Sequence, residues 1–290
     1  MPAIDAHVHL IDLNRSPGDY SWAQGMPAVW KEFLISQLRQ ELQETDINGI
    51  VLVQARQTLE ETDWLLGIAR QNPDMVRGVV AWFDLKSPTV ERDIEARVGP
   101  QLVGARHILQ AEHSEYMAHP DFDRGLDVLA DHTLAYDILV TQDQLFAAVG
   151  MVKAHPHLTF VLDHLGKPSL RNHANGSGPR ETQYNYWREA IQALADCGNV
   201  YCKVSAGALE ADPHGWQADE IMRYIAFACT TFGNSRIVFG TNAPVVRDAY
   251  TENASWQWYD LVKRHLFDAP ARLEAMMHHN AVAAYRLNHR

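Results

Sequence analysis

The chain has 290 residues, of which 47% are hydrophobic and 21% are charged, and a formal net charge of −11. This size and balance allow a large buried core, in two domains or in one α/β barrel. The negative charge argues against nucleic acid and anionic membrane surfaces as partners, because both call for clustered lysine and arginine.

Eight short apolar runs rich in β-forming residues recur along the chain, each followed by a segment with helical spacing. They are Ala3–His7, Gly49–Val53, Gly78–Phe83, Leu102–Ile108, Thr133–Val140, Leu158–Asp163, Val200–Ser205 and Arg236–Gly240. Apolar spacings of three and four, as in Trp30, Phe33 and Leu34, indicate amphipathic helices between them. This alternation predicts one (β/α)8 TIM barrel domain over residues 1–290. An open doubly wound sheet is the alternative, but no Gly-rich phosphate loop follows any strand.

The links from strand to helix are often long, whereas those from helix to strand are short. The long ones are Leu10–Ala28, Leu165–Arg180, Ala206–Gln217 and Ala243–Ser255. Long loops in a compact domain usually serve a function or are disordered. In a barrel all four emerge at the C-terminal face, where barrel active sites lie.

The run Asp5-Ala6-His7-Val8-His9-Leu10 lies on the first predicted strand. Residues two apart on a strand point to one face, so His7 and His9 are expected to aim at a common point. Neutral imidazole is a metal ligand and a proton carrier near neutral pH. The alternative is a pair of hydrogen-bonded structural histidines.

Nearly every predicted strand ends in polar residues. They are His7, His9, Gln54, Arg56, Trp82, Asp84, Arg106, His107, Gln110, Asp137, Asp163, His164, Lys203, Ser205, Thr241 and Asn242. Charges are costly to bury unless they are paired or used, so this set predicts a polar pocket. We expect Asp163 to point away from His164 across its strand, and Lys203 either to line the pocket or to form an ion pair.

Five motifs in this order resemble those of the amidohydrolase superfamily, and within it the branch of sugar-lactone hydrolases. They are DAHVHL on the first strand, GARHILQ at Gly104–Gln110, VLDHLGKP at Val161–Pro168, VYCKVS at Val200–Ser205 and FGTNAP at Phe239–Pro244. The tail from His279 to Leu287 is also similar to the closing helix of that branch. The resemblance covers essentially the whole chain and implies a barrel that opens lactones of sugar acids.

The resemblance also implies a set of metal or catalytic positions, with one departure. His7 and His9 match the first-strand pair, His164 matches the sixth-strand histidine, and Asn242 stands where the family has an aspartate that takes a proton from water. No bridging lysine is evident on the fourth strand, so the resemblance allows at most one divalent metal such as zinc and requires none. His7, His9, His164 and Asn242 are its expected ligands.

Asparagine cannot accept a proton as aspartate does. Three explanations stay open: another group such as His164 or Asp84 is the base, the activity is lost or reduced, or the asparagine is a replacement that keeps the shape of a natural aspartate.

Lactone hydrolysis needs an activated water and a group that stabilises the carbonyl oxygen. We expect His7, His9 and His164 on the water and carbonyl side, with Asn242 orienting the water. Arg106 is expected to polarise the carbonyl or to bind sugar oxygens, because its planar fork suits paired oxygens and stays charged when enclosed. The expected contacts with the sugar are Tyr20, Trp22, Gln54, Trp82 and Gln110.

The predicted activity is hydrolysis of a sugar-acid lactone (an L-fucono-, L-rhamnono- or related aldono-1,4- or 1,5-lactone) by a carboxylic-ester hydrolase. The alternatives are a metal-dependent decarboxylase or an amide hydrolase of the same superfamily, and an inactive form that binds the sugar acid. The three cysteines form no C-x-x-C pair, and we find neither a signal segment nor an apolar run of membrane-spanning length, which is about 18 residues. These features favour a cytoplasmic protein with reduced thiols. The sequence does not fix the oligomeric state.

Overall fold

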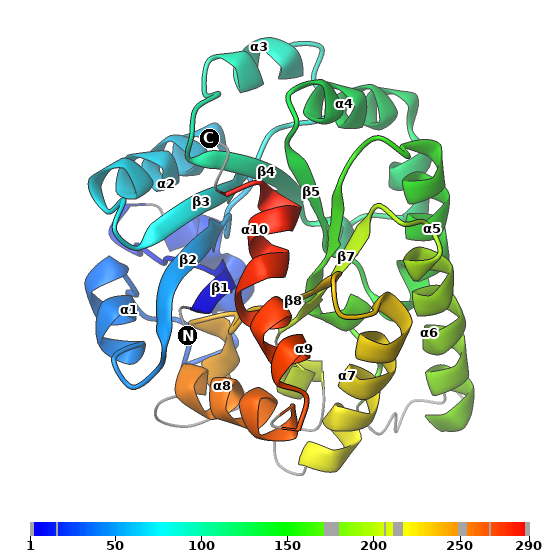
Figure 1. Ribbon diagram of the computed structural model, residues 1–290. Helices are drawn as coiled ribbons and strands as arrows, with labels where there is room; N and C mark the ends of the chain where they lie inside the picture. The colour runs from blue at the N-terminus through cyan, green and yellow to red at the C-terminus, as the bar shows by residue number, and fades with distance from the viewer. Residues whose placement is uncertain are drawn as a thin grey trace.

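Eight parallel strands follow one another around a barrel in chain order (Figure 1). They are β1 Ala3–Val8, β2 Ile47–Val53, β3 Val76–Ala81, β4 Leu102–His107, β5 Ala135–Ile138, β6 Phe160–Leu162, β7 Val200–Val204 and β8 Ile237–Phe239. The barrel closes where Asn242 N donates to His7 O at 2.8 Å and His9 N donates to Ala243 O at 2.7 Å. The predicted (β/α)8 barrel and its eight strands are confirmed.

The computed structural model describes residues 3–15, 17–170, 180–205, 207–210, 217–248, 254–266 and 268–287. Parts of all four long predicted loops lie outside these ranges. The helices are α1 Ile35–Glu41, α2 Leu59–Gln71, α3 Val90–Glu95, α4 Pro120–Asp131, α5 Leu145–Ala154, α6 Arg180–Ala195, α7 Ala218–Phe232, α8 Ala254–His265, α9 Pro270–Glu274 and α10 Asn280–Tyr285. Among the helices described, none combines the length and the apolar character that crossing a membrane requires.

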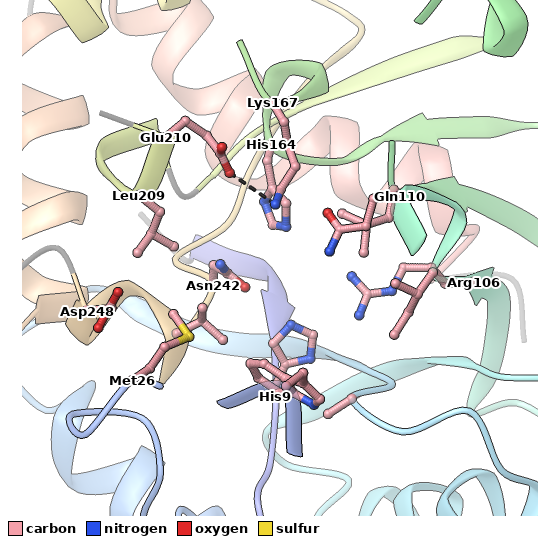
Figure 2. A pocket seen from close by; sticks show the side chains of 15 residues that line it. His9, Met26, Arg106, Gln110, His164, Lys167, Leu209, Glu210, Asn242 and Asp248 are labelled. Carbon is pink, nitrogen blue, oxygen red and sulfur yellow. Dashed lines mark ion pairs between the residues drawn. The ribbon is translucent and has the colours of Figure 1, made fainter. Parts of the chain in front are cut away.

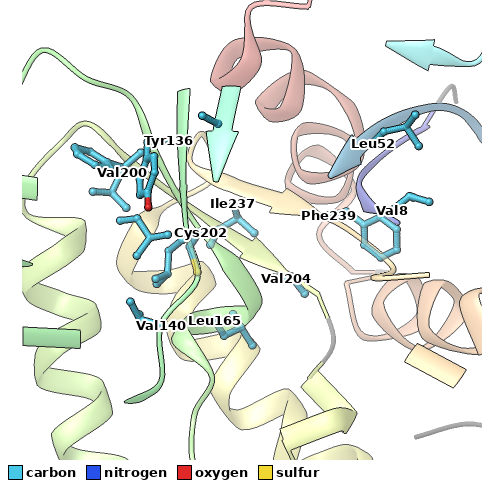
Figure 3. Close-up of a cluster of buried hydrophobic side chains, with 14 of the residues drawn as sticks. Val8, Leu52, Tyr136, Val140, Leu165, Val200, Cys202, Val204, Ile237 and Phe239 are labelled. Atoms are coloured by element: carbon cyan, nitrogen blue, oxygen red, sulfur yellow. The ribbon is translucent and has the colours of Figure 1, made fainter. Parts of the chain in front are cut away.

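The alternation of side chains along each strand separates two apolar clusters. On β7, Val200, Cys202 and Val204 belong to the large cluster between the strands and the surrounding helices, part of which Figure 3 shows. A smaller cluster fills the barrel itself, with Val51, Val161 and Val238 among its members. Lys203 lies between the outward residues of β7 and therefore points into the barrel.

Helix α10 covers the N-terminal end of the barrel. Its Asn280 Nδ2 donates to the carbonyl of Ile237, the first residue of β8, at 2.7 Å. Tyr285 joins the interior cluster, and its hydroxyl lies 2.9 Å from both carboxylate oxygens of Asp137. The interior is thereby closed at this end, and the opposite end is left for a site.

An irregularity in β1 positions the first histidines. Between Asp5 and Val8 the chain advances three residues on β1 against two on β2, from Ile50 to Leu52, which is a β-bulge. Gly240, which directly follows the neighbouring strand β8, leaves the necessary space, because a Cβ there would lie 2.7 Å from the Cβ of His7. The bulge and this glycine together let His7 enter the barrel interior.

Candidate active site

A cavity of about 540 Å³ opens at the C-terminal end of the barrel (Figure 2). Its lining residues come from strand ends and from the loops that follow them. They are His9, Trp22, Met26, Ala55, Arg106, Ile108, Gln110, Leu139, His164, Lys167, Leu209, Glu210, Asn242, Val245 and Asp248. The size suits a small molecule rather than a polymer chain.

His9 lies at the cavity floor with one ring nitrogen anchored. Its Nδ1 donates to the carbonyl of Val53 at 2.8 Å, which leaves Nε2 with a lone pair. That Nε2 lies 3.1 Å from Nε2 of His7. Burial lowers the pKa of His9 to about 3, so the imidazole is neutral at neutral pH.

His7 lies beneath the cavity, fully buried. Its Nδ1 is 3.1 Å from Nζ of Lys203 and 3.2 Å from Oδ1 of Asp163, and its Nε2 is 3.3 Å from Nη1 of Arg106. Burial lowers the pKa of His7 well below its usual value. Its expected partnership with His9 therefore exists, but His7 does not contact the cavity directly.

His164 enters the site through a left-handed turn that follows β6. His164 and Leu165 both have positive φ, 54° and 57°, which few non-glycine residues adopt. The turn brings the His164 ring to 4.5 Å from the His7 ring, and its Nδ1 forms a 2.8 Å hydrogen bond with Ser205 Oγ. Burial lowers the pKa of His164 well below its usual value.

The same turn corrects the expectation for Asp163, which was to point away from His164. Val161 faces the barrel interior, so Asp163, two residues later, faces it too. The turn then adds His164 to the same side. Burial alone would raise the pKa of Asp163, but Lys203, His7 and His164 outweigh it and hold that pKa well below its usual value.

Lys203 is the centre of the charge cluster inside the barrel. Its ammonium lies 2.7 Å from Asp137 Oδ2, 2.9 Å from Asp163 Oδ1 and 3.1 Å from His7 Nδ1. It donates hydrogen bonds to Asp137 and His7 and forms an ion pair with Asp163, whose Oδ1 has no hydrogen-bond partner among the described residues. Lys203 was expected either to line the pocket or to form an ion pair, and the structure shows the ion pair.

Arg106 extends from β4 to the cavity, and part of its guanidinium is already bonded. Nη1 donates to Asp163 Oδ2 at 3.0 Å, and Nη2 donates to the carbonyl of Gln54 at 2.5 Å. Gln54 Nε2 donates in return to the carbonyl of Arg106 at 3.2 Å. The buried Nε has no hydrogen-bond partner in the described structure. Asp163 and Gln54 therefore hold Arg106 in place, and its guanidinium keeps a donor that no described residue uses.

Asn242 lies at the cavity floor in a left-handed conformation, with φ of 62°. Its backbone N–H is committed to His7 O, and its buried Oδ1 has no hydrogen-bond partner among the described residues. An orphaned buried oxygen that lines a cavity is positioned to receive a hydrogen bond from a bound molecule.

The ligand atoms at this site fit one divalent cation, but the charges around them attract it only weakly. Ligand atoms of His7, Asp163 and His164 all lie within 4.8 Å of one another, and His9 Nε2 and Asn242 Oδ1 are adjacent donors. The histidines are neutral, as zinc requires. However, Asp163 is already paired with Lys203 and Arg106, and these two positive charges oppose a third.

The predicted sugar contacts divide into two groups. Trp22 and Gln110 line the cavity. Tyr20 is fully buried, and the Cζ atom of Arg56 lies 5.6 Å from the centre of the Tyr20 ring. Gln54 is bonded to Arg106, and Trp82 Nε1 donates to His107 Nδ1 at 3.4 Å. Tyr20, Gln54 and Trp82 are not among the lining residues, so any role in binding would act through their neighbours.

Three charged lining residues were absent from the predicted site: Lys167, Glu210 and Asp248. Glu210 and Asp248 lie in two of the long predicted loops, at positions that no motif fixes. Lys167 lies within the motif VLDHLGKP, which is the signal that could have identified it. Asp84, one of the two alternative bases, is exposed and does not line the cavity.

Comparison with known proteins gives one consistent family. A sequence model described as "Amidohydrolase" matches residues 4–287. A protein named L-fucono-1,5-lactonase from Burkholderia ambifaria is 32% identical over 84% of this chain and 81% of its own. Another of that name from Burkholderia multivorans is 31% identical over 87% of this chain and 86% of its own.

A solved structure agrees. A Burkholderia multivorans amidohydrolase crystallised with bound zinc is 29% identical, covers 99% of both chains and superposes with a TM-score of 0.89.

Proposed function

Because the chain belongs to the amidohydrolase family, we propose that it hydrolyses lactones of sugar acids, of the L-fucono-, L-rhamnono- or related aldono-1,4- or 1,5-type, to the free acids. The observation that carries this proposal is the convergence of Arg106, His9 and His164 on one cavity. The names of the two L-fucono-1,5-lactonases support the choice of substrate.

Arg106 polarises the lactone carbonyl. Water attack places negative charge on the carbonyl oxygen, and the guanidinium of Arg106, a residue that lines the cavity, donates a hydrogen bond to it. Asp163 and Gln54 hold the guanidinium in position before substrate arrives, so little reorganisation accompanies the reaction. Such preorganised stabilisation is often the largest single contribution to catalysis.

His164 is the base that takes a proton from the attacking water. With its Nδ1 bonded to Ser205 Oγ, its Nε2 is available to accept a proton. Asn242 Oδ1 accepts a hydrogen bond from the same water and orients it, because an amide oxygen has lone pairs but does not take up a proton near neutral pH. The ring oxygen leaves as an alkoxide, and the proton that His164 has taken up returns to it.

If a divalent ion binds, His7, His9, His164 and Asn242 hold it. It then supplies Lewis-acid polarisation of the carbonyl and a lower pKa for a bound water. The roles of Arg106 and Asn242 described above do not depend on it.

A pH-monitored screen of sugar 1,4- and 1,5-lactones tests the proposal. The wild-type protein should release acid from at least one of them, and His164→Gln should lower kcat by about 10²-fold or more, the usual contribution of a general base. His157→Gln, an exposed histidine in the link before β6, is the matched control and should retain full activity. No turnover of any lactone in the screen would reject the proposal.

The absence of a carboxylate at residue 242 favours a second candidate, a sugar-acid binder without turnover. Lactones or aldonates would then raise the melting temperature of the protein while no acid is released.

A further inference from the structure

The charged side chains of the cavity wall differ in whether they are paired. Lys167 and Glu210 form an ion pair with 3.1 Å between Nζ and Oε1. Arg106 is paired with Asp163. Asp248 lines the same cavity, and no hydrogen bond or ion pair engages its carboxylate within the described ranges. An unpaired acid in a cavity is available to a ligand.

The chain around Asp248 is firmly held. Asp248 ends the short helix Val245–Asp248, which follows β8. Val246 N donates to Asn242 O at 3.0 Å, and Arg247 N donates to Pro244 O at 3.0 Å. The Arg247 side chain bonds to Glu41 and lies over the Phe33 ring. Asp248 thus stands at a defined place relative to Asn242.

Asp248 lies across the cavity from the reacting groups. In Figure 2, Arg106 and Gln110 are on one side, Asp248 and Leu209 are on the other, and Asn242 and His164 lie between them. A lactone whose carbonyl contacts Arg106 therefore presents the opposite edge of the molecule to Asp248.

We propose that Asp248 is a specificity-determining residue that accepts hydrogen bonds from hydroxyl groups on the substrate edge remote from the carbonyl. A carboxylate accepts hydrogen bonds and repels another anion. The site therefore selects uncharged polyhydroxylated lactones and disfavours lactones with an additional carboxylate. Lys167 offers such a carboxylate little compensation, because Glu210 neutralises it. This inference rests on the proposed lactone hydrolysis.

The experiment compares Asp248→Asn with the wild-type protein on three lactones: a polyhydroxylated aldonolactone, unsubstituted δ-valerolactone, and an aldarate monolactone that carries a free carboxylate. Loss of charge-assisted hydrogen bonds should lower kcat/KM for the aldonolactone about tenfold or more, mainly through KM. The rate for δ-valerolactone should stay within about twofold, because it has no hydroxyl to lose. The rate for the carboxylate-bearing lactone should rise.

Asp131→Asn removes one exposed carboxylate at the end of α4 and is the matched control for net charge. It should leave all three rates unchanged. An equal effect of Asp248→Asn on all three lactones, or no effect on the aldonolactone, overturns the inference while lactone hydrolysis stands.

If the wild-type protein hydrolyses none of the three and no other lactone of the pH-monitored screen, the proposed function fails separately. The role of Asp248 is then decided by thermal stabilisation with the aldonolactone. Stabilisation that Asp248→Asn reduces supports it, and equal or absent stabilisation overturns it.

Discussion

Two neighbouring regions of the barrel use charged residues in opposite ways. Inside the barrel, the Lys203 ammonium is paired with Asp137 and Asp163 and bonded to His7, and Tyr285 donates a hydrogen bond to Asp137. In the cavity above it, Asn242 Oδ1 and Asp248 have no partner within the described part of the chain. Both regions are polar, but only the second presents its unused hydrogen-bonding atoms at a cavity, where a ligand can reach them.

This difference separates structural from functional charges. A buried ion pair costs desolvation energy that good geometry repays, so a cluster of closely paired charges fixes the shape of the site. An unsatisfied buried polar atom costs energy until a ligand or water bonds to it. We therefore expect substitutions in the interior to change stability first, and substitutions in the cavity to change catalysis first.

The largest expected effect is on stability, in Lys203→Met. The substitution leaves Asp137 and Asp163 buried without their cation, and breaking a buried pair in this way typically costs about 3–5 kcal/mol. Denaturant unfolding followed by circular dichroism measures the change. Lys263→Met removes a lysine from the exposed pair with Asp46 and should cost about 1 kcal/mol or less. Equal losses in the two variants would show that the interior cluster is not structural.

The next effect is on rate, in Asn242→Asp. The left-handed backbone at residue 242 tolerates aspartate as well as asparagine, and the new carboxylate would lie at the cavity floor where Oδ1 lies now. A general base typically contributes 10²–10⁴-fold, so we expect kcat to rise by about 10²-fold. An unchanged or lower lactonase rate would reject aspartate as the better base at this position.

Asn242→Ala provides the control for that gain. It removes the amide without adding a base, so the rate of this variant should be lower than that of the wild-type protein. A rate increase in both variants would mean that removal of the asparagine, not the new carboxylate, is responsible.

The smallest expected effect is that of metal removal. Because Lys203 and Arg106 oppose a bound cation and Asn242 brings no charge, we expect lactonase activity to persist after exhaustive chelation. Metal analysis before and after treatment, beside the rate, checks this. Complete loss of activity that Zn²⁺ restores would contradict it and would favour the metal-dependent alternatives, decarboxylation included.

The strands and the polar residues at their ends were predictable because they follow from the local pattern of apolar and polar residues. Alternation along each strand and the recurring apolar runs gave all eight strands, and the polar residues after them gave His9, Arg106, His164 and Asn242, which do line one cavity. The first-strand histidines were predicted as a pair, and their Nε2 atoms are indeed 3.1 Å apart. The motifs are also local features of the sequence, and the family that they indicated is confirmed.

Other features depend on contacts between distant segments. The prediction that Asp163 points away from His164 was wrong because the left-handed turn at His164 brings both side chains to the same side of the strand. The sequence left open whether Lys203 lines the pocket, because only packing places Asp137, Asp163 and His7 around its ammonium. Tyr20 and Trp82 were expected at the sugar, yet Tyr20 packs under Arg56 and Trp82 bonds to His107.

The sequence by itself determined a barrel, its order of strands and the kinds of group at their ends, because strand pattern and motifs are local properties of the chain. The tertiary structure alone decided which of those groups pair with one another and which line an open cavity. That distinction depends on distances of a few ångströms between residues such as Lys203 and Asp137, or Lys167 and Glu210, that lie tens of positions apart.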